Sequence, residues 1–303
     1  MRKLPVFRSV GEVFSGVTRH YFQLIGVAWP ALIFILIAMG LYAWSFHQAG
    51  IGALFDLLNA EGTPPEEIGA AYEAVAERAT GPVYYAAFIL TTLASAVAAV
   101  RWHRFVLMGE GGSFLLRMED ARYIWTFIKV TLLYFLMAVL LFAVIFGIAG
   151  IAGIAERGGN PAGAGFLGVV LAISMVIGYL LILGLSLRLM LALPDVAIGL
   201  PGKVRAVLAA TQGNTWRMVG YALLIGLVYG VVILVLILVL AILGGVLGAG
   251  PLVLAISGVV GIAAYFYFVM LSVTMLSVAY REIVGLPGGH EGEATVAEPT
   301  PGL

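Results

Sequence analysis

Cysteine is absent from this 303-residue chain, and charge is scarce, since only 11% of the residues are Asp, Glu, Lys or Arg. Without cysteine the chain has no disulfide, no thiol nucleophile and no thiolate metal ligand. Sixteen basic residues balance sixteen acidic ones, so no excess of positive charge indicates a nucleic-acid partner. The composition therefore excludes thiol chemistry and argues against nucleic-acid binding.

Sequence motifs for catalysis and metal binding are also missing. The chain has no Gly-x-Ser-x-Gly elbow, no His-Glu-x-x-His pair and no phosphate-binding loop. Its four histidines lie far apart, and no two are one helical turn apart, as the clustered ligands of a zinc site would be. They are His20, His47, His103 and His290. We therefore expect no cofactor, no metal and no catalytic residue, and an enzyme is the least favoured class.

Most of the residues in the chain are apolar. Apolar residues make up 62% of it and the mean hydropathy is +1.08, whereas a soluble domain is about 45–50% apolar. A bilayer core of about 30 Å needs about 20 apolar residues per helix. Six runs reach that length, at 24–46, 83–107, 130–154, 166–193, 218–243 and 252–280. The sequence predicts an all-α integral membrane protein with one six-span domain, a helical bundle, over residues 1–284.

Polar and amphipathic segments lie between and around the spans. Valines at 6, 10, 13 and 17 recur at helical spacing and predict an amphipathic helix over residues 4–19. Such a helix lies in the headgroup plane or packs on its own bundle. Thr63-Pro-Pro-Glu66 predicts a helix start with a capping box. Residues 285–303, rich in Gly, Pro and Glu, predict a disordered cytoplasmic tail.

The distribution of Lys and Arg predicts the orientation of the chain. Fourteen of the sixteen lie in the N-terminal segment, in 101–129, in 188–217 or after the last span, on one side of a six-span layout. The other side has only Arg78 and Arg157. Because Lys and Arg concentrate in cytoplasmic loops, both termini are predicted to be cytoplasmic.

An internal repeat is predicted from an alignment of residue 10 with residue 204. Val10, Phe14 and Phe22 then match Val204, Leu208 and Trp216, which gives a first and a third copy. A weaker middle copy begins near residue 116. Each copy is a cytoplasmic amphipathic helix, an aromatic residue and a helical hairpin. Such copies would be parallel repeats about an axis normal to the membrane. The alternative is that the bilayer imposes this pattern on any such unit.

Charged residues at the basic ends of the spans are the candidate lipid-headgroup or ion-pair residues: Arg101, Arg104, Glu110, Arg188 and Asp195. Arg101 and Arg104 share one helix face and are best interpreted as arginines that snorkel to the interface. Arg188 is deeper in its span, where burial of an unpaired arginine costs several kcal/mol. For Arg188, snorkelling and a site are equally favoured, and its expected partner is Glu110, Asp195 or a lipid phosphate.

The stretches Arg188-Leu-Met-Leu-Ala-Leu-Pro-Asp195 and Lys203–Arg217 resemble a family of multi-span bacterial membrane proteins of unknown function. That family includes the membrane domain fused to glycerophosphodiester phosphodiesterases. Its members share an Arg near the end of a span, a Pro shortly after it, a short helix, a Gly and an aromatic residue. The resemblance implies a bacterial cytoplasmic (inner) membrane and a connection with lipids. This chain has no room for the soluble phosphodiesterase domain, so that activity is not implied.

Three classes of function remain. The first is a lipid- or envelope-related membrane protein without catalysis, whose partners are membrane lipids. The second is a small-molecule transporter or channel, which is weakened because the span interiors from residue 83 to residue 280 contain no Asp or Glu. The third is a scaffold subunit for another membrane protein, with a protein partner or a second copy of the chain.

Overall fold

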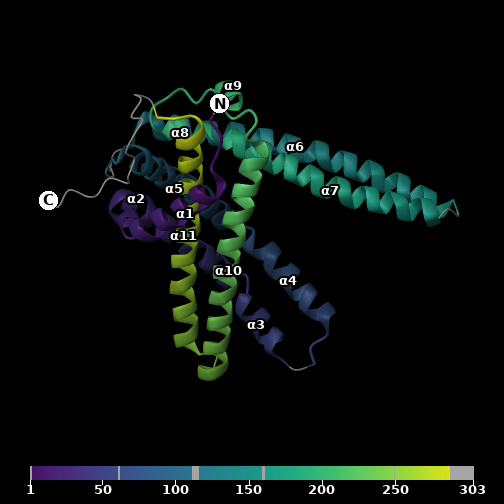
Figure 1. Cartoon of the computed structure of the whole chain (residues 1–303). Helices are drawn as coiled ribbons and strands as arrows, with labels where there is room; N and C mark the ends of the chain where they lie inside the picture. The colour runs from purple at the N-terminus through teal and green to yellow at the C-terminus, as the bar shows by residue number, and fades with distance from the viewer. Residues whose placement is uncertain (1, 61, 111–115, 159–160, 249, 287–303) are drawn as a thin grey trace.

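The computed structural model describes residues 2–60, 62–110, 116–158, 161–248 and 250–286. Within these ranges the regular elements are α-helices: α1 Val6–His20, α2 Gln23–Gln48, α3 Ile51–Asn59, α4 Pro65–Ala79, α5 Pro82–Met108, α6 Met118–Arg157, α7 Pro161–Met190, α8 Ala192–Ala197, α9 Val204–Ala210, α10 Thr215–Leu247 and α11 Pro251–Ile283 (Figure 1). The predicted disordered tail lies, from residue 287 onward, outside the described residues.

The predicted fold class is confirmed, because six helices are long and apolar enough to cross a membrane. These segments are Gln23–Gln48, Pro82–Met108, Met118–Ile151, Gly165–Ala197, Thr215–Leu247 and Ala255–Ile283. The fourth predicted span is interrupted after Met190, and α8 follows as a separate short helix. Pro194 has no backbone N–H to bond the carbonyl of Met190, which is a physical reason for the break.

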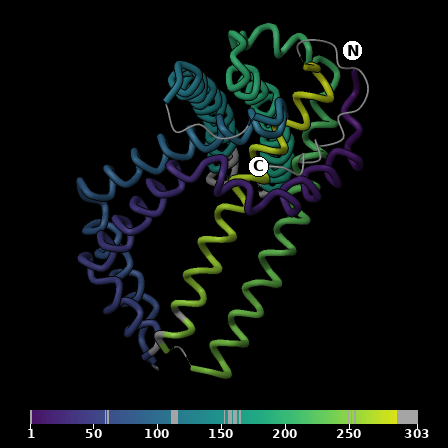
Figure 2. Tube along the Cα trace, turned by 90° about the vertical axis from the view of Figure 1, so that its left-hand side faces the viewer, coloured from purple at the N-terminus to yellow at the C-terminus, as the bar shows by residue number. Residues whose placement is uncertain are grey.

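The six long helices form three hairpins that meet at one end and diverge from it. α2 packs against α5 and α6 against α7, while α10 is joined to α11 by a short connection. Figure 1 shows the α6–α7 hairpin pointing sideways and the α10–α11 hairpin pointing down, and Figure 2 shows α2 and α5 leaning away from α10 and α11. The bundle expected from the sequence is therefore open.

We call the shared end the junction. It consists of α8, α9, the last turns of α5, α7 and α11, and the first turns of α6 and α10. All six residues of α8 are buried there, and α8 contacts α5, α6, α7 and α11. The junction thus contains the polar residues that connect the three hairpins.

Helix α1 packs on the spans of its own chain. Val10, Val13 and Val17 form its buried face, and α1 contacts α10 and α11. Its Glu12 forms an ion pair with Arg281 of α11. Of the two predicted positions for this helix, the structure has the packed one.

The capping box predicted at residues 63–66 is wrong. Helix α4 begins at Pro65, with Pro64 as its N-cap and no side-chain hydrogen bond at the cap. The Thr63 hydroxyl instead donates to the carbonyls of Leu57 and Ala60, each at 3.1 Å. The threonine therefore satisfies the carbonyl end of α3, where the last turn leaves acceptors unpaired.

The three predicted copies differ in their local structure. α1 and α9 are separate helices that precede α2 and α10, as the first and third copies require. In the middle copy α6 runs without a break from Met118, so no separate amphipathic helix precedes that span within the described residues. The repeat itself stays a prediction.

Candidate functional site

The last turns of α5 place four consecutive polar or aromatic residues at the centre of the junction. Residues 101–104 point in successive directions around the helix, since each residue is rotated by about 100° from the one before. Together the four side chains therefore reach α6, α8 and α11. Trp102 donates its Nε1–H to the Thr274 hydroxyl of α11 at 2.8 Å, and it is buried.

His103 connects α5 to both α11 and α6 and is fully buried. Its Nδ1 lies 2.7 Å from the Ser277 hydroxyl, and its Nε2 lies 3.3 Å from the Tyr123 hydroxyl. Ser277 donates its own proton to the carbonyl of Val273 at 3.0 Å, so the serine accepts from His103. The imidazole is thus used as a hydrogen-bonding crosslink between three helices.

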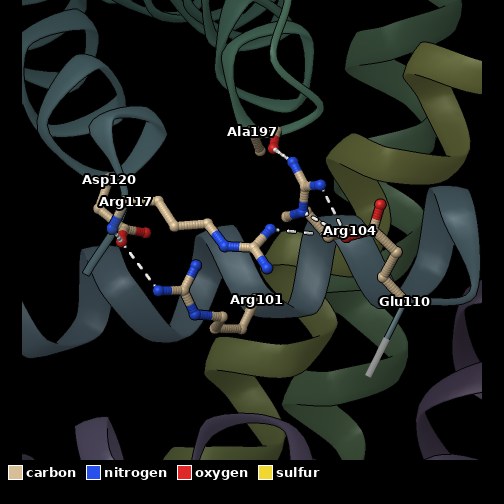
Figure 3. Close-up of polar contacts among 6 residues, drawn as sticks. All are labelled: Arg101, Arg104, Glu110, Arg117, Asp120 and Ala197. Atoms are coloured by element: carbon tan, nitrogen blue, oxygen red, sulfur yellow. Dashed lines mark hydrogen bonds and ion pairs between the residues drawn. The ribbon is translucent and has the colours of Figure 1, made fainter. Parts of the chain in front are cut away.

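Arg101 forms an ion pair with Asp120 at the start of α6 (Figure 3). Its Nη2 donates to Asp120 Oδ2 at 2.8 Å, and the two side chains are each 4% exposed. The same oxygen accepts the backbone N–H of Arg117 at 2.7 Å. The sequence prediction that Arg101 snorkels is wrong, because its charge is neutralised by a buried carboxylate inside the protein.

Arg104 is also held within the protein. Its Nε and Nη2 donate to Glu110 Oε2 at 2.9 and 2.6 Å, and its Nη1 donates to the carbonyl of Ala197 in α8 at 2.9 Å (Figure 3). Arg117 lies 3.8 Å from the same Glu110 oxygen. Glu110 is 41% exposed, so this pair lies at the protein surface, and snorkelling of Arg104 stays a prediction. We call Arg101, Arg104, Glu110, Arg117 and Asp120 the arginine–carboxylate cluster.

Asp195 binds neutral groups of the junction and no arginine. The Tyr280 hydroxyl donates to its Oδ1 at 2.6 Å, and the backbone N–H of Gly202 donates to its Oδ2 at 2.8 Å. Gly202 has φ +60°, and an added Cβ would lie 2.1 Å from Cγ2 of Val196. The glycine is thus required for the turn that brings its N–H to Asp195.

Arg188 of α7 has only neutral partners among the described residues. Its Nε donates to the Thr211 hydroxyl at 2.9 Å, its Nη1 to the Thr215 hydroxyl at 3.3 Å and its Nη2 to the carbonyl of Leu208 at 2.6 Å. The predicted pairing with Glu110 or Asp195 is wrong, because Glu110 binds Arg104 and Asp195 binds Tyr280.

The structure does not bring the five predicted residues into one site. Arg101, Arg104 and Glu110 belong to the arginine–carboxylate cluster, Asp195 to the α8–α11 contact, and Arg188 to the α7–α9–α10 contact. Sequence reasoning missed Asp120, which follows a Glu directly before the third span. An acid at the start of an apolar span, facing the basic end of the preceding span, is a signal that could have identified it.

An apolar hollow lies between α2, α5 and α11 and has an empty volume of about 270 Å³, counted with the space at its open side. Side chains such as Ile35, Trp102 and Met270 line it. The indole N–H of Trp102 is already bonded to Thr274. The hollow therefore offers surface to hydrocarbon and no hydrogen-bonding group to a polar solute.

In the part of the chain that the structure describes, no three His, Cys, Asp or Glu side chains are grouped to hold a metal ion. The carboxylates of the junction accept hydrogen bonds from arginine, tyrosine or backbone groups. Searches with family models, against curated proteins and against solved structures found no match.

Proposed function

We propose that this chain is a non-catalytic membrane protein of the bacterial inner membrane that binds membrane lipids through its basic junction. The observation that carries the proposal is the division of the junction arginines into two groups. Arg101 and Arg104 are neutralised by carboxylates, whereas Arg188 and Arg217 have only neutral partners among the described residues. Of these two, Arg188 lies at the end of a span, and its positive charge has no carboxylate partner among the described residues.

Exposed hydrocarbon supports a lipid environment for all three hairpins. Large apolar side chains are exposed along α2, α5, α6, α7 and α10, among them Phe34, Phe88, Leu132, Phe135, Phe146, Val176, Leu234, Leu238 and Ile242. Continuous apolar faces of this size do not stay in water. The fourteen Lys and Arg residues on the junction side of the layout support a cytoplasmic junction and cytoplasmic termini.

A scaffold function is the second candidate. The observation that favours it is the α6–α7 hairpin, which extends away from the rest of the chain in Figure 1. The two helices contact each other along their length, and their contacts with other helices are fewer. A partner membrane protein could cover this hairpin. The transporter function has less support, because the hollow described above is lined by apolar side chains.

Purification in native lipid, followed by mass spectrometry of what remains bound after a detergent wash, tests the proposal. We expect phospholipid to be retained in a composition that differs from the lipid extract of the same membranes. A retained soluble metabolite without phospholipid would support the transporter. A retained protein without specific phospholipid would support the scaffold, and either result would contradict the proposed function.

A further inference from the structure

We propose that Arg188 binds the phosphate group of an anionic phospholipid at the α7–α9–α10 contact. This inference rests on the proposed lipid-binding function and specifies the headgroup and the residue that recognises it. It is carried by the charge and hydrogen bonds of Arg188, which differ from those of Arg101 and Arg104.

The guanidinium of Arg188 has more N–H donors than it has acceptors among the described residues. A guanidinium has five N–H donors, and three of them reach Thr211, Thr215 and Leu208. The remaining two, one on each terminal nitrogen, have no acceptor among the described residues. A phosphate oxygen pair is the geometry that such terminal N–H groups match best.

The partners of Arg188 position it without neutralising it. Thr211 is fully buried and donates its own proton to the carbonyl of Val207 at 2.9 Å, so its oxygen is available to accept from Arg188. The carbonyl of Leu208 belongs to the last turn of α9, where the helix carries partial negative charge. Two hydroxyls and a carbonyl hold the side chain in one place and leave its full positive charge for a ligand.

The surroundings of Arg188 add further positive charge. Lys203 and Arg205 of the α9 segment are exposed, and no carboxylate of the described residues lies within 4.0 Å of either. Trp216, next to Thr215, is 61% exposed at the start of α10. An exposed Trp beside basic residues at the end of a span is typical of the headgroup region. A lipid phosphate can reach this region from the bilayer without entering a pocket.

Native mass spectrometry of the full chain tests the proposal with two lipids that have the same acyl chains. Phosphatidylglycerol carries net negative charge, whereas the phosphate of phosphatidylcholine is balanced by its choline. We expect the wild-type protein to retain phosphatidylglycerol preferentially. Arg188→Gln should weaken that binding by about tenfold or more, because a charge-assisted hydrogen bond is lost. Arg188→Lys should weaken it less.

The matched control is Arg122→Gln. Arg122 is exposed near the start of α6, on the same predicted side, and the substitution changes the net charge equally. It should leave the preference for phosphatidylglycerol unchanged. If both Gln variants weaken binding equally, the effect is general attraction to an anionic lipid and the proposal is overturned. If inorganic phosphate at low millimolar concentration displaces the lipid, the ligand of Arg188 is a soluble phosphate, and the proposal that it is a lipid headgroup is overturned.

The failure of this inference and that of the proposed function are distinguishable. If the wild-type protein retains neither lipid, both fail. If it retains both lipids equally and Arg188→Gln changes nothing, the lipid-binding function stands and the Arg188 site is overturned. Should Arg188→Gln fail to fold, Arg188→Lys is compared with the wild-type protein instead, because lysine keeps the charge but lacks the paired terminal N–H groups of the guanidinium. We expect it to weaken phosphatidylglycerol binding several-fold, and wild-type binding by this variant would overturn the proposal.

Discussion

Asp120 Oδ2 lies 2.8 Å from Nη2 of Arg101, and each side chain is 4% exposed. The two residues are nineteen positions apart, one near the end of α5 and the other at the start of α6. The ion pair therefore joins the first hairpin to the second. It also explains how an arginine can be buried at the end of a membrane span, because its charge has a partner inside the protein.

Breaking this pair from one side should be strongly destabilising. We expect Asp120→Asn or Arg101→Met to lower the free energy of unfolding by about 3–5 kcal/mol, because the remaining charge would be buried without its partner. The double variant Arg101→Met with Asp120→Leu should recover much of that loss, since it leaves no unpaired charge. Unfolding in mixed micelles of detergent and denaturant measures the effect, with Arg122→Gln as the control for a lost surface charge.

The hairpins and their approximate limits could be predicted from the sequence. Each span is a continuous apolar run, and its length can be compared directly with the length of helix needed to cross a bilayer. The predicted fifth span, for example, begins at residue 218, inside α10, which begins at Thr215. The partner of Arg101 could not be predicted, because a buried ion pair depends on which helices meet in space. Snorkelling was favoured for Arg101 because the residue lies near the end of a span, where a long side chain can reach the interface.

The divergence of the hairpins could not be predicted either. Apolar faces of similar hydrophobicity suit lipid and protein equally, so composition does not specify which helices touch. The contacts that decide it are single polar bonds at the junction, such as His103 with Ser277 and Arg104 with the carbonyl of Ala197. Each joins segments more than ninety residues apart, and no periodicity in the sequence marks them.

The hydrogen bond from Tyr280 to Asp195 should contribute to the attachment of α8 to α11. Tyr280→Phe removes only the hydroxyl that donates to Oδ1 at 2.6 Å. We expect a loss of about 1.5–3 kcal/mol, the range for a hydrogen bond to a charged group. Thermal unfolding followed by circular dichroism measures it. Tyr85→Phe, at a tyrosine that is 55% exposed, is the control and should be neutral. Equal stability of the two variants would contradict the assigned contact.

Asn214 should hold the N-terminal segment in place. Its side-chain oxygen accepts the backbone N–H of Leu4 at 3.0 Å, and its Nδ2 donates to the carbonyl of Arg2 at 2.9 Å. Asn214→Ala removes both bonds and should release this segment while the spans stay folded. Faster hydrogen exchange of the Leu4 amide and faster proteolysis before α1 are the expected results. Gln212→Ala, at an exposed position nearby, should change neither rate.

Gly184 should be required for the close packing of α7 on α10 that also positions Arg188. An added Cβ there would lie 2.6 Å from Cγ2 of Thr215 and 2.9 Å from Cγ2 of Val219. Gly184→Ala should therefore push the two helices apart and cost about 1–3 kcal/mol, as overpacking does. Thr215 accepts a hydrogen bond from Arg188, so the same substitution should also weaken anionic-lipid binding.

The control for this prediction is Gly230→Ala in the middle of α10, where an added Cβ would meet no atom within 4 Å. Alanine is the better helix former by about 1 kcal/mol, so this variant should be neutral or slightly more stable. Thermal unfolding of the two variants, together with their phosphatidylglycerol binding, compares the positions. If Gly184→Ala is as stable as Gly230→Ala and binds lipid normally, the close α7–α10 contact does not position Arg188. A loss of both stability and lipid binding at Gly184 alone would connect the packing of α7 on α10 to the headgroup site, because Thr215 takes part in both.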